Sequence, residues 1–287
     1  MSVVDLPVAI VRGSLRLRVG AIGSLILLLI GFVSIVWTPW PIASFDIGSA
    51  LAGPSGAHWL GADQLGRDIL SLLMKGMLTS FVVSLVAVAI GALFGLPLGF
   101  AAARWPGLVA RGLGGAGDFV LLFPAIVLTM LLGTAFGPSF VNVMLALGLA
   151  NIPVFMRATR DALRATEPQD YVAAARLAGD GPIEIFRRHI LPNIIPVLLA
   201  TALAQLAFGV LAEASLSFVG LGAQPPATSL GLILRDGQGY AAQEPGLLLA
   251  PGLVLVAIVL ALNAASGGVR DVLAPPLRDI GGDDGAA

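Results

Sequence analysis

Six long runs of apolar residues recur along this chain, separated by polar connections. The runs cover residues 19–37, 76–103, 118–136, 140–156, 194–219 and 246–266. About 20 apolar residues in a helix cross the hydrocarbon core of a bilayer, and a helix satisfies its backbone hydrogen bonds internally. The sequence therefore predicts an all-α membrane protein with six transmembrane helices.

The composition agrees with this prediction and leaves few residues for structure outside the membrane. Of the 287 residues, 57% are hydrophobic and 11% are charged, whereas soluble domains have about 25% charged residues. Six spans use about 120 residues, so a large water-soluble domain is excluded. The first run is longer than the apolar region of a signal peptide, and we expect it to be a retained span.

Several classes of function are excluded by residues that the chain lacks. Cys is absent, and the net charge of −1 offers no electrostatic footprint for nucleic acid. The single lysine, Lys75, follows Met74 and not a glycine, so a G-x-x-x-x-G-K-[ST] phosphate-binding loop cannot form. We therefore expect no cofactor, metal site or ATPase site in this chain, and any ATP must be bound by another subunit.

The distribution of basic residues predicts the orientation. The two termini, the second-to-third connection and the fourth-to-fifth connection together hold 13 of the 16 Lys and Arg residues. Basic residues accumulate on the cytoplasmic side of membranes, so both termini are expected to be cytoplasmic. The two histidines, His58 and His189, then lie on opposite sides and cannot share a metal.

We expect three segments. Residues 1–75 contain the first span and an outer loop, residues 76–277 form a five-helix core with a cytoplasmic loop at 157–192, and residues 278–287 form a disordered tail. The loop 157–192 is the most charged part of the chain and holds six arginines. Its pattern predicts a helix of small residues that ends near Gly179, a break at 179–182, and a short amphipathic helix before Pro192. Such a shape could enter a groove on another protein, or simply connect two spans.

This loop resembles the EAA loop of ATP-binding cassette importer permeases. Ala174, Ala175, Gly179 and residues 190–193 (Ile-Leu-Pro-Asn) match the family pattern, whereas Ala173 stands where the family usually has Glu. The resemblance implies that the loop docks onto an ATPase subunit. The contact residues so implied are Ala173, Ala174, Ala175, Arg176, Gly179, Glu184, Arg187 and Arg188.

Two other segments resemble the dipeptide/oligopeptide/nickel group of these permeases. Residues 58–68 (HWLGADQLGRD) are similar to its H-x-L-G-T-D-x-x-G-R-D signature, and residues 215–226 (SLSFVGLGAQPP) to its L-S-F-L-G-L-G-x-x-P-P segment. Residues 263–277 match its C-terminal pattern more weakly. The resemblance implies the fold of a type I ABC importer permease. Within that group it implies a C-type permease subunit.

Four further charged residues are candidates for the outer loop or the substrate pathway: Asp63, Arg67, Asp68 and Glu213. The first three are close enough to pair, either as an ion-paired cap on the membrane face or as ligand contacts. Glu213 lies in the fifth span, where a carboxylate is costly unless it is paired or faces water. It either lines the path or forms a hydrogen bond to a neighbouring helix. Asp118 is expected to open the third span and to stabilise its positive end.

The resemblance implies a non-enzymatic transport subunit in the inner or plasma membrane of a prokaryote. Its partners would be a second homologous permease, two ATPase subunits that bind ATP and Mg²⁺, and an extracytoplasmic substrate-binding protein. Di- or oligopeptides are the implied substrate, with nickel or a nickel chelate as the alternative within the group. A self-sufficient secondary transporter is a further alternative from a different class, and it would need several ionisable residues at mid-membrane.

Overall fold

A computed structural model describes residues 15–105 and 107–273, so the expected tail at 278–287 lies outside the described residues. The regular elements of the described chain are all helical. The main helices are α2 (Leu15–Val33), α3 (Ile69–Arg104), α4 (Leu108–Leu122), α5 (Ala125–Phe136), α6 (Phe140–Thr166), α7 (Asp170–Leu177), α8 (Pro182–Ile185), α9 (Leu191–Phe218), α10 (Leu230–Gly237) and α11 (Gly246–Leu273). Short 3₁₀ turns occupy Ile47–Ser49 and Gln238–Tyr240, and a π-helical turn, η3, occupies Phe186–Ile190.

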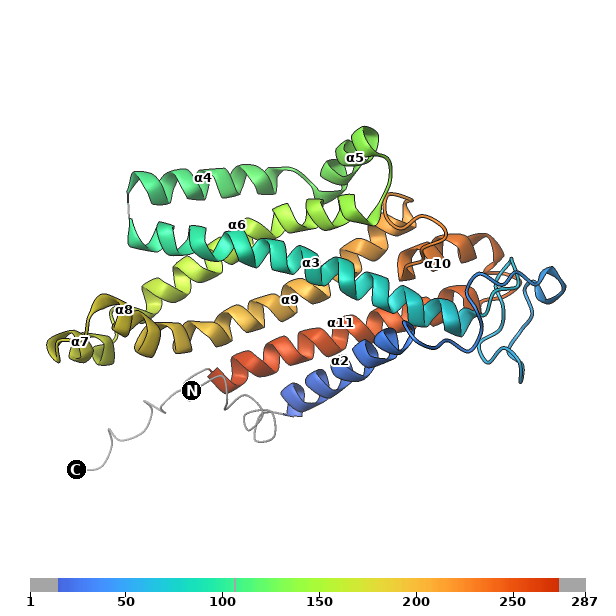
Figure 1. The fold of residues 1–287 in the computed structure, drawn as a ribbon, viewed down its shortest axis with the longest axis horizontal. Helices are drawn as coiled ribbons and strands as arrows, with labels where there is room; N and C mark the ends of the chain where they lie inside the picture. The colour runs from blue at the N-terminus through green and yellow to red at the C-terminus, as the bar shows by residue number, and fades with distance from the viewer. Residues whose placement is uncertain (1–14, 106, 274–287) are drawn as a thin grey trace, which may run out of the picture.

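The long helices form a bundle whose two ends differ (Figure 1). Among the described residues, five helices are long and apolar enough to cross a membrane, namely α2, α3, α6, α11 and the continuous helix Ile183–Phe218 that includes α9. A sixth span is formed if α4 and α5 are counted together. One end of the bundle holds α7 and α8, and the other holds α10 and the loop before α3. We name residues 167–190 the knuckle and residues 34–68 the cap.

The third predicted span is broken and does not form one helix. Its two halves, α4 and α5, are bent by 75° at Phe123 and Pro124. Pro124 lacks a backbone N–H, and a residue before proline avoids the α region, as Phe123 does with φ −87° and ψ 114°. The helix also begins at Leu108 and not at Asp118. The expected role of Asp118 at a helix N-terminus is therefore wrong.

Two other helix boundaries differ from those expected. Helix α3 begins at Ile69 because Asp68 caps it, so the expected boundary between residues 75 and 76 falls inside this helix. Helix α6 continues to Thr166, and the first ten residues of the expected loop 157–192 are therefore its last turns. Charged residues on an exposed helix end look like a loop in composition, although they continue the helix.

Helices α3 and α6 pack closely because glycines recur every four residues along α3. A Cβ at Gly91 would lie 2.3 Å from the Cβ of Asn151, and one at Gly95 would lie 2.6 Å from the Cβ of Phe155. Gly99 is equally close to Thr159. Small residues at this spacing let two membrane helices approach backbone to backbone. This contact holds α3 against α6, the helix that precedes the knuckle.

Candidate functional site

The cap ends in a tight turn around a buried carboxylate, Asp63. Its Oδ1 accepts hydrogen bonds from the backbone N–H groups of Leu65 and Arg67, both at 2.8 Å. Its Oδ2 accepts from Arg67 Nε at 2.6 Å. Gly66 has φ +72°, and a Cβ there would lie 1.8 Å from the carbonyl oxygen of Asp46. The turn therefore requires a glycine at this position.

Asp68 has a different role, because it caps helix α3. Its Oδ2 accepts from the backbone N–H and the hydroxyl of Ser71, at 2.8 and 2.7 Å. His58 Nδ1 lies 3.1 Å from its Oδ1, and the Ser71 hydroxyl in turn accepts from the backbone N–H of Trp40 at 3.0 Å. These contacts attach the cap to the first turn of α3. Of these charged residues, Asp63 and Arg67 pair with each other, whereas Asp68 contacts Ser71 and His58.

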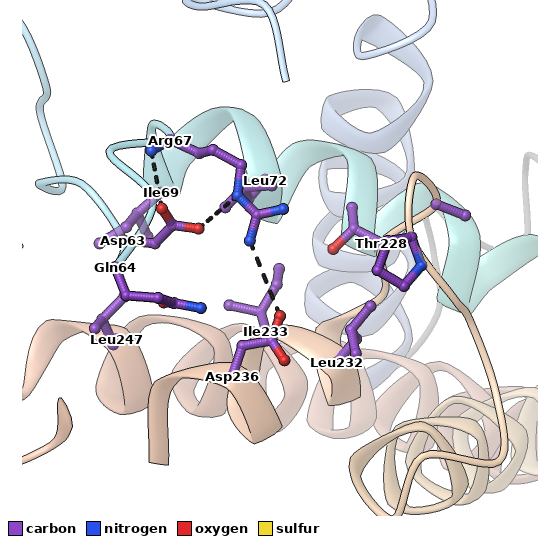
Figure 2. Close-up of a pocket in the computed structure, with 12 residues that line it drawn as sticks. Asp63, Gln64, Arg67, Ile69, Leu72, Thr228, Leu232, Ile233, Asp236 and Leu247 are labelled. Carbon is purple, nitrogen blue, oxygen red and sulfur yellow. Dashed lines mark hydrogen bonds and ion pairs between the residues drawn. The ribbon is translucent and has the colours of Figure 1, made fainter. Parts of the chain in front are cut away.

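The cap meets α10 at a small pocket that is partly open to solvent (Figure 2). Arg67 Nη2 lies 3.9 Å from Asp236 Oδ2, so one guanidinium faces carboxylates from two elements. Thr228 and Gln64 also line the pocket, and the Gln64 Oε1 atom is buried without a hydrogen-bond partner. Burial raises the pKa of the Asp236 carboxyl, Arg67 and Arg235 oppose that rise, and Asp63 adds to it. The pocket joins the two signature segments, 58–68 and 215–226, that are far apart in the sequence.

Glu213 is fully buried in α9 and is hydrogen-bonded on both carboxylate oxygens. Ser80 of α3 donates to Oε2 and Ser217 donates to Oε1, each at 2.6 Å. The Ser217 hydroxyl also accepts from the backbone N–H of Ala223 at 3.3 Å. Glu213 therefore connects α3, α9 and the segment that follows α9. This arrangement is the interhelical hydrogen bond that the sequence offered as an alternative to a pathway role.

The knuckle exposes some of the expected contact residues and buries others. Ala173, Ala174, Arg176 and Gly179 are exposed, whereas Ala175 is 7% exposed and packs with Val172 against the end of α6. Gly179 has φ +90° and ends α7. Arg187 and Arg188 are exposed and pair with Glu184, the former at 3.7 Å.

Two apolar residues of the knuckle were missed by the sequence analysis. Leu177 is 90% exposed and Ile183 is 83% exposed, on either side of Gly179. They are the most exposed large apolar side chains of the described knuckle. Apolar residues flanking a glycine break in an Arg-rich segment were the available signal. Both side chains are therefore available on the surface for contact with another protein.

A second missed feature is an ion pair between α4 and α6. Arg157 Nη2 donates to Asp118 Oδ1, and both side chains are exposed. Within residues 15–105 and 107–273, no group of three His, Asp or Glu side chains is placed to hold a metal ion. The described charged residues thus include those of the cap, the buried Glu213 and the exposed pair Asp118–Arg157.

Comparisons with known proteins agree with this arrangement. The family described as binding-protein-dependent transport system inner membrane component matches residues 95–279. The di/tripeptide transport system permease protein DppC of Pseudomonas aeruginosa is 32% identical over 275 residues, which cover 91% of this chain and 89% of that protein. The glutathione transport system permease protein GsiD of Pectobacterium atrosepticum is 33% identical, with 82% and 78% covered.

A solved structure shows the same fold. A chain of the MetNI methionine ABC transporter, in an inward-facing conformation, superposes with a TM-score of 0.57. The match covers 70% of this chain and 96% of that chain at 24% identity. The helical architecture is therefore that of a type I importer permease, in a multi-pass protein of the plasma membrane. This chain belongs to the family of binding-protein-dependent transport system inner membrane components.

Proposed function

We propose that this chain is the permease subunit of an ATP-driven importer of di- or oligopeptides. The observation that carries the peptide assignment is the similarity to di/tripeptide and dipeptide permeases over most of both chains. The complex would contain a second homologous permease, two ATPase subunits that bind ATP and Mg²⁺, and an extracytoplasmic binding protein. This chain would contribute the path and no catalytic group.

The knuckle is the docking site for an ATPase subunit in this proposal. Leu177 and Ile183 supply exposed apolar contacts, and the exposed Arg176, Arg187 and Arg188 lie on the same knuckle. Apolar anchors with a charged rim are typical of protein interfaces. The Arg-rich end of the bundle is cytoplasmic in this proposal, as the distribution of basic residues predicts.

The helix that follows the knuckle can transmit a displacement to the end of the bundle where the cap lies. Residues Ile183–Phe218 form one continuous helix of 36 residues, about 54 Å long at 1.5 Å per residue. Its far end holds Glu213, which is tied to α3 and to the segment after α9. A displacement of the knuckle on ATP binding would therefore shift the end of the helix that lies near the cap. The inward-open and outward-open states of the bundle would then be stabilised differently.

The docking test compares two isoleucines that are equally exposed. Ile183→Asp places a charge in the proposed interface, whereas Ile47→Asp changes an isoleucine that is also 83% exposed but lies in the cap. Both variants are co-expressed with the other subunits of the transporter, and ATPase co-purification and uptake are measured. We expect Ile183→Asp to lower ATPase association by at least about tenfold, a loss typical of a hot-spot residue. We expect Ile47→Asp to leave the association unchanged.

Uptake by the same complexes distinguishes the substrates. Proteoliposomes with the binding protein are supplied with a labelled dipeptide, glutathione or Ni²⁺. We expect ATP-dependent dipeptide uptake that is lost with Ile183→Asp. Uptake of Ni²⁺ without uptake of the dipeptide or glutathione would contradict the peptide assignment. Unchanged ATPase association in Ile183→Asp would contradict docking through the knuckle.

A further inference from the structure

The ion pair between Asp118 and Arg157 has an unusual position. Its side chains are 71% and 39% exposed. Asp118 lies seven residues beyond Arg111 on α4, a distance of about 10 Å along the helix, and Arg157 directly follows the apolar run 140–156. The pair is therefore set inside the length of the bundle and exposed on its surface.

An exposed ion pair on two membrane-spanning helices does not suit a lipid-facing surface. Ionisable side chains within membrane helices face a bundle interior or a water-filled cavity, because contact with hydrocarbon is costly. Asp118 has no second described partner that could satisfy its carboxylate inside the chain. In the assembled transporter such a surface would face water or a neighbouring subunit.

The exposed face of α4 changes character at Asp118. One turn before it, on the side of Arg111, Gly114 and Gly115 have open space where a Cβ would lie. One turn beyond it, Leu121 and Leu122 are exposed apolar side chains at 43% and 75%. A small, charged face followed by an apolar one is the arrangement of an aqueous vestibule that ends at a hydrophobic constriction.

We propose that Asp118 and Arg157 line the translocation pathway at the inner end of a vestibule that opens on the knuckle side. The inference rests on the proposed peptide transport for its ligand. A peptide carries an ammonium and a carboxylate terminus, and Arg157 and Asp118 offer the complementary charges at one level of the path. The pair opens as the peptide passes, and its charges then discriminate between acidic and basic side chains.

The first test measures the accessibility of the vestibule to water. The chain has no cysteine, so a single introduced thiol gives the only label on this subunit. Gly115→Cys and Leu122→Cys are compared in inverted membrane vesicles that contain the assembled, nucleotide-free transporter, with a membrane-impermeant maleimide. Leu108→Cys, at the 81% exposed start of α4, is the accessible control, and Leu260→Cys, 64% exposed on α11, is the membrane control.

We expect Gly115→Cys to react at a rate similar to Leu108→Cys, because the reactive thiolate needs water. We expect Leu122→Cys and Leu260→Cys to react at least about tenfold more slowly, since water is excluded there. A rate for Gly115→Cys as low as that for Leu260→Cys would overturn the proposal. Labelling of Gly115→Cys only when the second permease is left out would also overturn it, and would identify an interface between permeases.

The second test asks whether the two charges select among peptides. Asp118→Asn leaves the positive charge of Arg157, so uptake of a basic dipeptide should fall relative to an acidic one. Arg157→Gln leaves the negative charge, so the ratio should move in the opposite direction. We expect each ratio to change about threefold to tenfold, the size of a screened charge interaction. Equal losses for both peptides in both variants would show a purely structural pair and would overturn the pathway role.

The two tests separate this inference from the proposed function. If the wild-type complex takes up no peptide, the substrate assignment fails, and the labelling pattern still decides whether the vestibule exists. If peptides are transported and Gly115→Cys is not labelled, only the pathway inference fails.

Discussion

At the scale of single residues, burial and neighbours decided roles that the sequence left open. Asp63 and Asp68 are both acidic and five positions apart, yet one closes a turn with Arg67 and the other caps α3. The difference follows from position, because Asp68 directly precedes the helix and its carboxylate reaches the N–H of Ser71. The sequence could predict that these residues pair, but not which partner each would take.

Asp236 gives a prediction that depends on pH. Burial raises the pKa of this carboxyl above its ordinary value despite the attraction of Arg67 and Arg235. Its charged form is therefore disfavoured by folding at neutral pH, and the penalty disappears as the pH falls through the raised pKa. We expect Asp236→Asn to raise the thermal midpoint of the complex at pH 7. The difference from the wild-type chain should shrink on acidification, and a lower midpoint for the variant at pH 7 would contradict this account.

At the scale of elements, the hydrophobic runs predicted which segments are helices but not where they bend or how they pack. The break between α4 and α5 follows from Pro124, which could have been recognised as a helix boundary in the sequence. The glycines at 91, 95 and 99 were visible as a four-residue repeat. Their partner, α6, became evident only in the tertiary structure, since the repeat does not say which helix it meets.

The tight contact between α3 and α6 can be tested with two glycines. Gly95→Ala places a Cβ 2.6 Å from the carbonyl oxygen of Ile152, whereas Gly112→Ala on α4 has no atom within 4 Å. We expect Gly95→Ala to destabilise the protein by about 1–3 kcal/mol through overpacking. Gly112→Ala should be neutral or should stabilise the helix by up to about 1 kcal/mol. Thermal unfolding in detergent checks this order, and equal midpoints would exclude the close contact.

At the scale of the whole molecule, one helix runs from the knuckle to the end of the bundle that holds the cap. The buried Glu213 ties the cap end of that helix to Ser80 of α3, and the knuckle end packs against α6 through Val172 and Ile190. Both ends are thus anchored in the bundle. In the proposed mechanism, a change at the knuckle reaches the cap through this helix.

Glu213 allows this connection to be tested apart from docking. Glu213→Leu removes both acceptors and leaves two buried serine hydroxyls without their partner, which costs about 1–3 kcal/mol for each. Glu213→Gln keeps an acceptor and the side-chain shape. We expect Glu213→Leu to lose most peptide uptake while ATPase association is kept, and Glu213→Gln to retain a large part of the uptake. Full uptake in Glu213→Leu would contradict a connecting role.

The sequence by itself determined that this is a helical membrane protein, which family it resembles and which loop is proposed to contact a partner. These properties depend on local composition and on motifs a few residues long, which are readable without a fold. Only the tertiary structure decided that Asp118 meets Arg157, that Glu213 is tied to Ser80, and that Ala175 is buried while Leu177 and Ile183 are exposed. Each of those facts depends on which helices lie side by side and on which face each helix buries, and hydropathy along a chain does not contain that information.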